Sequence, residues 1–511
     1  MNVAKIYDEH EKRVKPRTTI HFEGREMLTT EIRKRGRRLG NALKGLGIKD
    51  GEVVAVSMSN CPEVIESFAA TFRIGAITVP ILFLLIEDEI RYILEDSGAV
   101  AIITDSALEQ KILDAAVGLE SIRHIIVVGG NDTPRTRDYE ALLQKSSPVL
   151  QVTDKDSDDV ALIMYTSGTT ALPKGVLLTH RNLYEAAKSL HEAQEVVEGT
   201  VPLLCLPLAH IYGISVMNTG AMSEFGEGTG VIMRWFDPAE FFRLVEKYGI
   251  TLFPGVPTML ALLLGNPTAG DHDLSSLKDC ISGSAPLPVE LQRAFMERFD
   301  CTVRQAYGLT ESSAIGAIQR PGHPHREGSA GKAYDTLELR IFDDDDNELG
   351  PGEIGELVLR GPQVMKGYLN RPEDTALALR GGWLRTGDLG YLDDEGFVYI
   401  TDRKTDLIIK GGENIMPVQI EEVIYGHPAV GETAVIGTRD AVYGQEITAY
   451  VCLKPAAQAT GAEILEFCEG RLASFKLPRE VLIVESLPKS SVGKILKREL
   501  VEKYEAEKRG T

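Results

Sequence analysis

Residues 160–178 read VALIMYTSGTTALPKGVLL, a polar, glycine-containing loop between two strand-like apolar runs. Its small residues let backbone N–H groups surround an anion, four hydroxyl groups add neutral donors, and Lys174 adds a positive charge. An ordinary flexible turn would not need so many convergent donors. The loop is not a Walker A loop, because the G-x-x-x-x-G-K-[ST] order is missing and the chain runs on into a strand. The segment therefore predicts a phosphate-binding loop.

Regular alternation in the part of the chain before this loop indicates an α/β fold. Short β-rich runs at residues 53–58 and 99–104 alternate with helical patterns, which is typical of parallel strands with crossover helices. Residues 340–369 change to short strands divided by Gly and Pro, which indicates a small antiparallel or barrel-like unit. The acidic turn at residues 343–346 could bind a cation, but it is expected to be a solvated loop.

A second domain is expected near the C-terminus. From Arg403 onward the chain should form a compact α+β module, with strands at residues 433–436 and 448–453 and a helix at residues 462–475. Since 511 residues exceed one compact core, the α/β body should itself be divided. The prediction is a large N-terminal domain, residues 1–402, of two α/β subdomains plus the barrel-like unit, followed by a C-terminal domain, residues 403–511.

Composition excludes several classes of protein. A formal net charge of −20 argues against a general nucleic-acid binder, which needs a surplus of Lys and Arg. The six cysteines show neither metal-ligand nor disulfide-framework spacing, so reduced thiols are expected. Residues 1–18 lack the apolar core of a secretory signal, and the longest apolar run, residues 74–86, contains Pro80 and is too short to span a bilayer. We expect a cytoplasmic protein without a transmembrane segment.

An amphipathic helix is expected at residues 28–46, with an apolar stripe beside a row of arginines and a lysine. This basic face could contact anionic lipid or an acyl carrier. The simpler interpretation, which we prefer here, is a solvated helix face.

Further motifs follow the phosphate loop in a fixed order: PLAHIYG at 207–213, SGSAP at 282–286, QAYGLTE at 305–311, WLRTGD at 383–388, TDRK at 401–404 and PKSSVGKILK at 488–497. With residues 165–175 they resemble the acyl-adenylate-forming enzymes, which include acyl-CoA synthetases, coumarate-CoA ligases, luciferases and the adenylation domains of peptide synthetases. The resemblance covers nearly the whole chain. One departure is Ala171, where a glycine is usual in the family, so a slightly altered phosphate loop is expected.

The resemblance implies an ATP- and AMP-binding site. Its residues would be Thr166, Ser167, Gly168, Thr169, Thr170, Lys174, Ser284, Ala285, Pro286, Gln305, Ala306, Tyr307, Gly308, Thr310, Asp388, Arg403 and Lys494. The chemistry agrees: Tyr307 offers a ring face to adenine, Gln305 an amide to its exocyclic amine, and Thr310 a donor to the α-phosphate. Glu311, with Thr166, would hold Mg²⁺ through oxygen ligands.

The resemblance also implies two half-reactions and a moving domain. Asp388 would accept the ribose hydroxyls, with Arg403 as a basic contact, and Lys494 would stabilise the charge that builds as pyrophosphate leaves. Rotation of the C-terminal domain about Lys404 or Thr405 would then withdraw Lys494 for transfer of the acyl group to coenzyme A.

Acyl and CoA contacts are implied in the same way. His210 alone would more often be a core histidine, but the motif around it favours a gate to the acyl tunnel. The acyl and CoA site would comprise His210, Tyr212, Val216, Gly411, Gly412 and Asn414. Apolar residues near these motifs favour a hydrophobic acid, with fatty, alicyclic and aromatic acids all open.

The predicted function is therefore an AMP-forming acyl-CoA synthetase that uses ATP, Mg²⁺ and coenzyme A. A peptide-synthetase adenylation domain would usually carry an Asp in the 207–213 segment to pair with a substrate amine, and a luciferase would need a luciferin pocket. A free-standing acyl-AMP ligase that loads a carrier protein stays open. From another class, a catalytically silent nucleotide-binding protein is disfavoured because Lys174, Glu311, Asp388 and Lys494 are all present. An oligomer and weak peripheral membrane contact also stay open.

Overall fold

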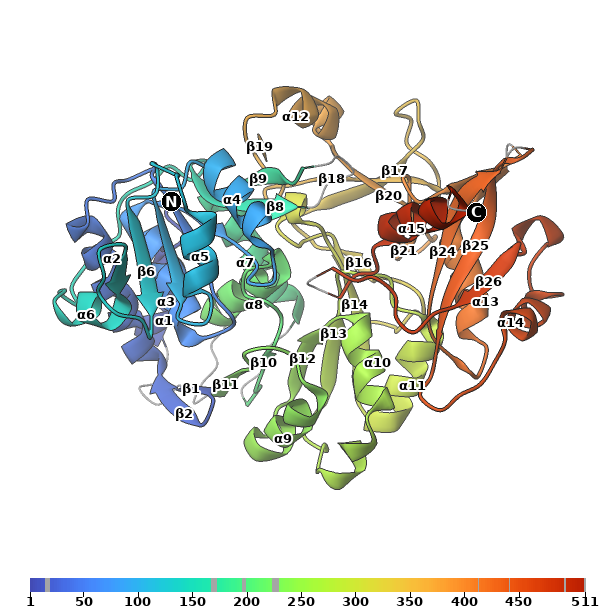
Figure 1. Cartoon of the computed structure of the whole chain (residues 1–511), viewed down its shortest axis with the longest axis horizontal. Helices are drawn as coiled ribbons and strands as arrows, with labels where there is room; N and C mark the ends of the chain where they lie inside the picture. Colours follow the sequence, from blue (N-terminus) through green and yellow to red (C-terminus); the bar gives the residue numbers. More distant parts are fainter. Residues whose placement is uncertain are drawn as a thin grey trace.

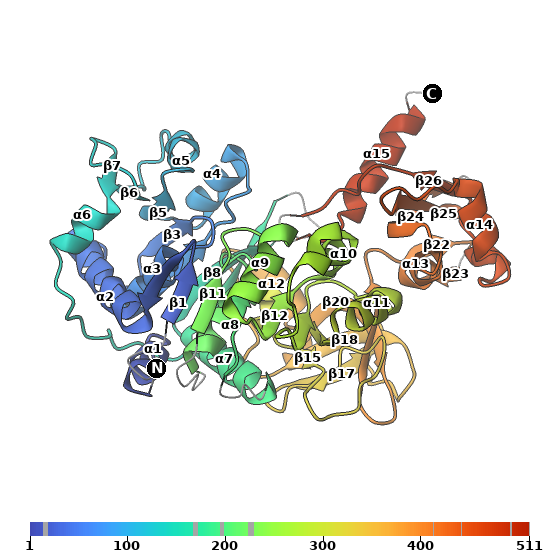
Figure 2. The same cartoon turned by 90° about the horizontal axis from the view of Figure 1, so that it is seen from below.

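A computed structural model describes residues 1–13, 19–166, 172–194, 199–222, 229–411, 413–440, 442–490 and 493–509. Figure 1 shows the N-terminal part of the chain in blue and cyan, a green and yellow centre, and the last hundred residues in red as a separate body at one side. Figure 2 shows the same separation from below. The fold is mixed α/β, as predicted.

The largest sheet carries the ends of the predicted phosphate loop. Its strand order is β19 (Gly367–Tyr368), β9 (Lys174–Thr179), β8 (Val160–Thr166), β4 (Ile77–Pro80), β3 (Val53–Ser57), β5 (Ala101–Asp105), β6 (His124–Val128) and β7 (Thr136–Asp138). From β4 to β7 the strands are parallel, whereas β8 and β9 form an antiparallel hairpin whose tip is the loop. The parallel strands β3 and β5 are buried along their whole length because helices cover both faces.

The helices of this part are α1 (Lys5–Arg13), α2 (Thr29–Gly45), α3 (Pro62–Ile74), α4 (Glu87–Asp96), α5 (Glu109–Ala115), α6 (Tyr139–Gln144), α7 (His180–Gln194) and α8 (Ile211–Met222). A small sheet of β10 (Leu203–Leu204), β11 (Thr229–Ile232), β1 (Thr19–Phe22) and β2 (Arg25–Leu28) lies beside them. Among the described residues no helix is both long and apolar enough to cross a membrane.

The basic face of α2 is neither a solvated face nor a free lipid-binding surface. Arg35 donates to buried Glu66 of α3 at 2.7 Å and pairs with Glu140 of α6, while Arg38 donates to the carbonyl oxygens of Leu143 and Ser146. The preferred expectation was therefore wrong, because these side chains join α2 to the neighbouring helices.

A second α/β unit holds β12 (Leu252–Gly255), β13 (Asp279–Ser282) and β14 (Thr302–Tyr307) in parallel, with β15 (Ala317–Ile318) and β16 (Lys332–Ala333) added antiparallel. Its helices are α9 (Pro238–Tyr248), α10 (Pro257–Gly265), α11 (Val289–Phe299) and the 3₁₀ turns η1 (Pro267–Asp271) and η2 (Thr310–Ser312). The two subdomains expected from the sequence thus correspond to two separate sheets, each with a buried cluster of its own, and a larger buried cluster that includes Leu162 of β8 and Ile281 of β13 joins them.

The unit predicted as antiparallel or barrel-like is an open antiparallel sheet. Its linear order is β17 (Glu338–Phe342), β18 (Gly355–Arg360), β20 (Leu384–Leu392) and β21 (Val398–Arg403), so the barrel-like description was wrong. Helix α12 (Pro372–Ala378) and the turn η3 (Arg380–Gly382) lie between β19 and β20 in the chain. The acidic turn between β17 and β18 is ion-paired and is not simply solvated.

The C-terminal part is an α+β module. Its sheet has the order β23 (Glu413–Ile415), β22 (Ile408–Lys410), β25 (Gly444–Leu453) and β24 (Val430–Asp440), and β26 (Glu480–Ile483) pairs with β25. Its helical elements are α13 (Pro417–Tyr425), α14 (Gly461–Cys468), η4 (Ser474–Lys476) and α15 (Lys497–Arg509). The helix predicted for 462–475 ends early, because the backbone turns extended at Glu469, with a ψ of 135°, directly after α14.

Candidate active site

The segment from β14 to η2 forms the centre of the candidate site. Gln305, Ala306 and Tyr307 are the last residues of β14, and after Gly308 the turn η2 carries Thr310 and Glu311. Gly308 packs against the backbone at Ala314, where an added Cβ atom would lie 2.3 Å from that carbonyl carbon. A larger residue would therefore move the turn that holds Thr310 and Glu311.

The loop Ser284, Ala285 and Pro286 lies beside this segment. It follows β13, and Ser282 at the end of β13 is in register with Gln305 of β14. Ser284 takes a left-handed φ of 69°, a conformation that costs energy for a residue other than glycine. The Nε2 atom of Gln305 is buried and has no hydrogen-bond partner within the described residues. A buried donor without a partner favours a ligand with an acceptor at that point.

Asp388 of β20 and Arg403 of β21 form an ion pair at the same place. Arg403 Nε lies 3.0 Å from Asp388 Oδ1, and the hydroxyl of Tyr307 donates to Asp388 Oδ2 at 2.7 Å. The Asp388 side chain is 7% exposed, so this carboxylate is held by donors from two sides. Burial and the nearby Asp388 raise the pKa of Tyr307 well above its ordinary value, which keeps the phenol protonated.

Lys494 reaches this pair from the C-terminal module. Its pKa is lowered to about 8, mainly by burial and further by Arg403, while Asp388 and Asp406 oppose the shift. The preceding Gly493 has a φ of 78°, and an added Cβ atom would lie 2.5 Å from Thr258 Oγ1 of α10. The loop that carries Lys494 therefore packs against the second α/β unit, and this contact leaves no room for a side chain at position 493.

Glu311 is linked to the ends of the phosphate loop through Tyr368. The Tyr368 hydroxyl donates to Glu311 Oε1 at 3.0 Å, and Lys174 Nζ lies 5.3 Å from the centre of the Tyr368 ring. Lys174 also pairs with Asp374 of α12 at 2.9 Å, and it is in register with Thr166 across the hairpin. Burial raises the pKa of Glu311, whose desolvated carboxylate would be stabilised by a cation.

The predicted acyl residues lie on α8 and against the nucleotide segment. Tyr212 donates from its hydroxyl to the Ile281 carbonyl at 2.9 Å, and Ser215 donates to the Ser313 carbonyl at 3.1 Å. Tyr212 and Val216 belong to an apolar cluster with Leu206, Val256 and Met259. Desolvation lowers the pKa of His210 to about 4, so its imidazole is neutral at pH 7. The crevice beside Val216 is too narrow to hold a water molecule.

A family model described as AMP-binding enzyme matches residues 7–369, and one described as AMP-binding enzyme C-terminal domain matches residues 419–494. The chain belongs to the AMP-binding enzyme family.

Relatives of this AMP-binding enzyme are named as acid–CoA ligases. The long-chain-fatty-acid–CoA ligase of Bacillus subtilis (strain 168) is 36% identical over 518 residues, which cover 95% of this chain and 91% of that protein. The indoleacetate–CoA ligase of Aromatoleum aromaticum is 33% identical over 500 residues, 97% of each chain. ATP-bound MatB from Rhodopseudomonas palustris superimposes with a TM-score of 0.89 at 30% identity, covering 99% of both chains. The expected family and the expected class, an acid–thiol ligase, are confirmed.

The family implies ATP and Mg²⁺, and the residues present fit both. Gln305 Nε2 lacks a partner in the described part of the chain, and Lys494 and Arg403 supply positive charge beside Asp388. In the same described part, no group of three or more His, Cys, Asp or Glu side chains could hold a metal ion. Glu311 would thus act as a lone carboxylate, an arrangement that suits Mg²⁺ because this ion keeps several waters and binds substrate phosphates.

Several predicted residues are not joined to the site by described contacts. Ser167, Gly168, Thr169, Thr170 and Gly412 lie outside the described residues, as does Ala171. Gly411 donates from its N–H to the Tyr443 carbonyl at 2.8 Å, within the C-terminal module, and Asn414 is a residue of strand β23 there. These positions stay predictions for a CoA path.

Sequence reasoning missed Tyr368, Asp374 and Thr258. Tyr368 and Asp374 reach the site because the two-residue strand β19 pairs with β9, with Tyr368 opposite Val176. A strand that short has no periodicity to detect. Thr258 opens an apolar helix, and only the packing of Gly493 reveals its role.

Proposed function

We propose that this AMP-binding enzyme is an AMP-forming acyl-CoA synthetase, which converts a hydrophobic carboxylic acid and ATP to acyl-AMP and pyrophosphate and then transfers the acyl group to coenzyme A. One observation carries the proposal. Half-buried Lys494 of the C-terminal module lies next to the ion pair between the buried Asp388 and the partly exposed Arg403, and the desolvated Glu311 is close enough to contribute to the electrostatics of Arg403.

The residues would divide the adenylation step among them. Asp388, already oriented by Tyr307 and Arg403, would accept the ribose hydroxyls, and Gln305 would bond to adenine. Lys494 would approach the α-phosphate and stabilise the negative charge that grows on it and on the attacking carboxylate, which favours the transition state over the ground state. When bound at Glu311, Mg²⁺ would neutralise phosphate charge and so help pyrophosphate to leave.

The thioester step would need a different arrangement of the same residues. The thiol must attack the acyl carbon of the adenylate, so Lys494 and its loop would withdraw from their seat at Thr258. We propose that the domain boundary lies near residues 402 and 403 and that the C-terminal module rotates about a pivot at Lys404 or Thr405. The segment 411–414 would then turn toward the site, and Gly412 would leave room for the pantetheine arm.

The acid would be apolar. Tyr212, Val216, Val256 and Met259 pack together in an apolar cluster next to the nucleotide segment. Such a lining favours fatty, alicyclic or aromatic acids over acids with a second charge. The relatives named for long-chain fatty acids and for indoleacetate agree with an apolar group but differ in its shape.

Acid-dependent exchange of labelled pyrophosphate into ATP tests the proposal. A panel of fatty acids of graded length, alicyclic acids and aromatic acids should contain at least one that supports exchange, and CoA should then yield the thioester. Thioester formation on an acyl carrier protein but not on CoA would favour the alternative acyl-AMP ligase. Nucleotide binding without exchange for any acid would favour the silent nucleotide-binding protein and refute the enzyme.

Lys494→Ala separates the two steps. It should reduce pyrophosphate exchange by about a hundredfold to a thousandfold, as loss of one preorganised charge contact does. Thioester formation from supplied acyl-adenylate should survive, and equal loss of both steps would contradict the alternating role of Lys494.

A further inference from the structure

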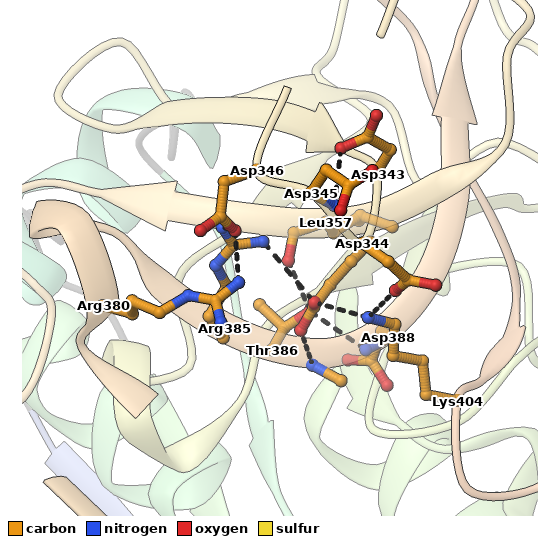
Figure 3. A network of polar contacts seen from close by, with 12 residues as sticks. Asp343, Asp344, Asp345, Asp346, Leu357, Arg380, Arg385, Thr386, Asp388 and Lys404 are labelled. Atoms are coloured by element: carbon orange, nitrogen blue, oxygen red, sulfur yellow. Dashed lines mark hydrogen bonds and ion pairs between the residues drawn. The ribbon is translucent and has the colours of Figure 1, made fainter. Parts of the chain in front are cut away.

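The acidic turn between β17 and β18 contacts the residue at the predicted pivot. Lys404 Nζ lies 2.8 Å from Asp344 Oδ1 and 3.0 Å from Glu356 Oε2 (Figure 3). Asp346 of the same turn pairs with both Arg380 and Arg385. The turn is therefore tied by charge to β20 and to the end of β21.

Glu356 is the buried member of this network. Its side chain is 8% exposed, whereas that of Asp344 is 90% exposed. One carboxylate oxygen accepts the backbone N–H of Gly387 at 2.9 Å, and the other meets Lys404 and lies 3.6 Å from Arg385. Since exposed ion pairs contribute little and a buried carboxylate stripped of its partners costs much more, Glu356 is expected to dominate the effect.

The groups that Glu356 holds lie directly beside the Asp388–Arg403 pair. Gly387 precedes Asp388 and Lys404 follows Arg403, and the Lys404 N–H donates to the Gly387 carbonyl at 2.8 Å. Asp388 and Arg403 are also in register across β20 and β21. The Glu356 carboxylate thus holds the residue before Asp388 on β20 and the residue after Arg403 on β21, the two strands that present the proposed ribose contacts.

Beyond Lys404 the described contacts become local. The Thr405 hydroxyl donates to its neighbour Asp406, and the Asp406 N–H donates to the Arg403 carbonyl. The chain therefore changes from a residue anchored by two carboxylates to an exposed residue bonded within its own turn.

We propose that Glu356, assisted by Asp344, is a positioning clamp on Lys404 that keeps the Asp388–Arg403 pair fixed on the larger domain while the C-terminal module turns about Thr405. The inference rests on the proposed nucleotide site. It assigns Glu356, Asp344 and Lys404 a role in nucleotide affinity, and it places the pivot after the clamp. Because AMP is bound in both half-reactions, loosening the clamp weakens ATP and acyl-AMP binding alike.

Calorimetric titration with MgATP tests the clamp without a known acid. Glu356→Gln places an amide N–H₂ against the Lys404 ammonium and should weaken ATP binding about tenfold, the effect of one lost charge-assisted contact. Asp344→Asn should weaken it about twofold, and only at low salt, as expected for an exposed pair. Asp345→Asn is the matched control on the same turn: no ion pair of Asp345 occurs in the described structure, so its affinity should equal that of the wild type.

Coupling to Lys404 distinguishes a clamp from a general loss of structure. Glu356→Gln combined with Lys404→Gln should bind ATP no worse than Glu356→Gln alone, because both changes remove one interaction. Lys404→Arg should retain affinity since it keeps the charge. The KM for supplied acyl-adenylate in the thioester step should rise with the Kd for ATP, while kcat changes little.

Three results would overturn the clamp. Additive losses in the double variant, or wild-type affinity in Glu356→Gln, would show that Lys404 is not positioned by Glu356. If Glu356→Gln slowed pyrophosphate exchange and accelerated the thioester step, Glu356 would instead hold the C-terminal module in its adenylation position. If the wild type itself binds no ATP, the proposed function fails and the clamp is not the cause.

Discussion

Lys494 should give the adenylation step an alkaline limit at an unusually low pH. Burial lowers its pKa to about 8, from an ordinary value near 10.5. The charge is present below this pKa and is lost as the pH rises through it. The charged fraction falls from about 90% at pH 7 to about 10% at pH 9, so kcat/KM for ATP should drop roughly tenfold across that interval.

The assay is pyrophosphate exchange at low MgATP, where kcat/KM reports the pKa of the free enzyme. Lys494→Arg is the informative variant, because an arginine with a pKa above about 12 stays charged and should move the limit beyond the measured range. Thioester formation from supplied acyl-adenylate serves as the internal control and should not fall over the same interval. A decline near pH 8 that persists in Lys494→Arg, or a flat wild-type profile to pH 9.5, would refute the role of Lys494.

Three further predictions concern single positions. Gly493→Ala should slow pyrophosphate exchange about tenfold and spare the thioester step, because a left-handed alanine is strained and its Cβ would meet Thr258 Oγ1. Equal slowing of both steps would show that the contact between Gly493 and Thr258 does not serve adenylation alone. Gln305→Met should raise the KM for ATP about tenfold with little change in kcat, the effect of one buried hydrogen bond, and an unchanged KM would remove Gln305 from the adenine pocket. Arg35→Met should destabilise the protein to urea by about 3 kcal/mol because Glu66 is left buried without its cation, whereas Arg25→Met, on the exposed β2, should change the midpoint little.

Local sequence predicted those parts of the fold that have a local cause. Strands β3 and β5 lie within a few residues of their predicted ranges, and β8 and β9 are the two apolar runs on either side of the phosphate loop, since apolar runs that end in turn residues have few other solutions. The motifs around Tyr307 and Asp388 also marked segments that the structure brings together. Each carried several chemically specific residues in a row.

Predictions failed where the deciding partner is distant in the chain. The arginines of α2 resembled a solvated face because Glu66 and Glu140 lie far away in sequence. The acidic turn resembled a solvated loop because Lys404 is reached only after β18, β20 and β21 have paired. In both cases a run of like charges was satisfied by long-range ion pairs, which composition alone does not reveal.

The two lysines of the proposed site are held in opposite ways, and this difference bears on the order of events. Lys174 is already paired with Asp374, so a phosphate must compete with a carboxylate oxygen at 2.9 Å for the Lys174 contact. At Lys494, burial and the nearby Arg403 destabilise the charged form of the side chain. An arriving phosphate would therefore raise the pKa of Lys494 and favour its charged form. Nucleotide binding would therefore stabilise the docked lysine loop, and release of pyrophosphate would remove part of that stabilisation. Part of the charge that would hold the C-terminal module in place would thus be lost in the same step after which the proposed mechanism needs the module to withdraw.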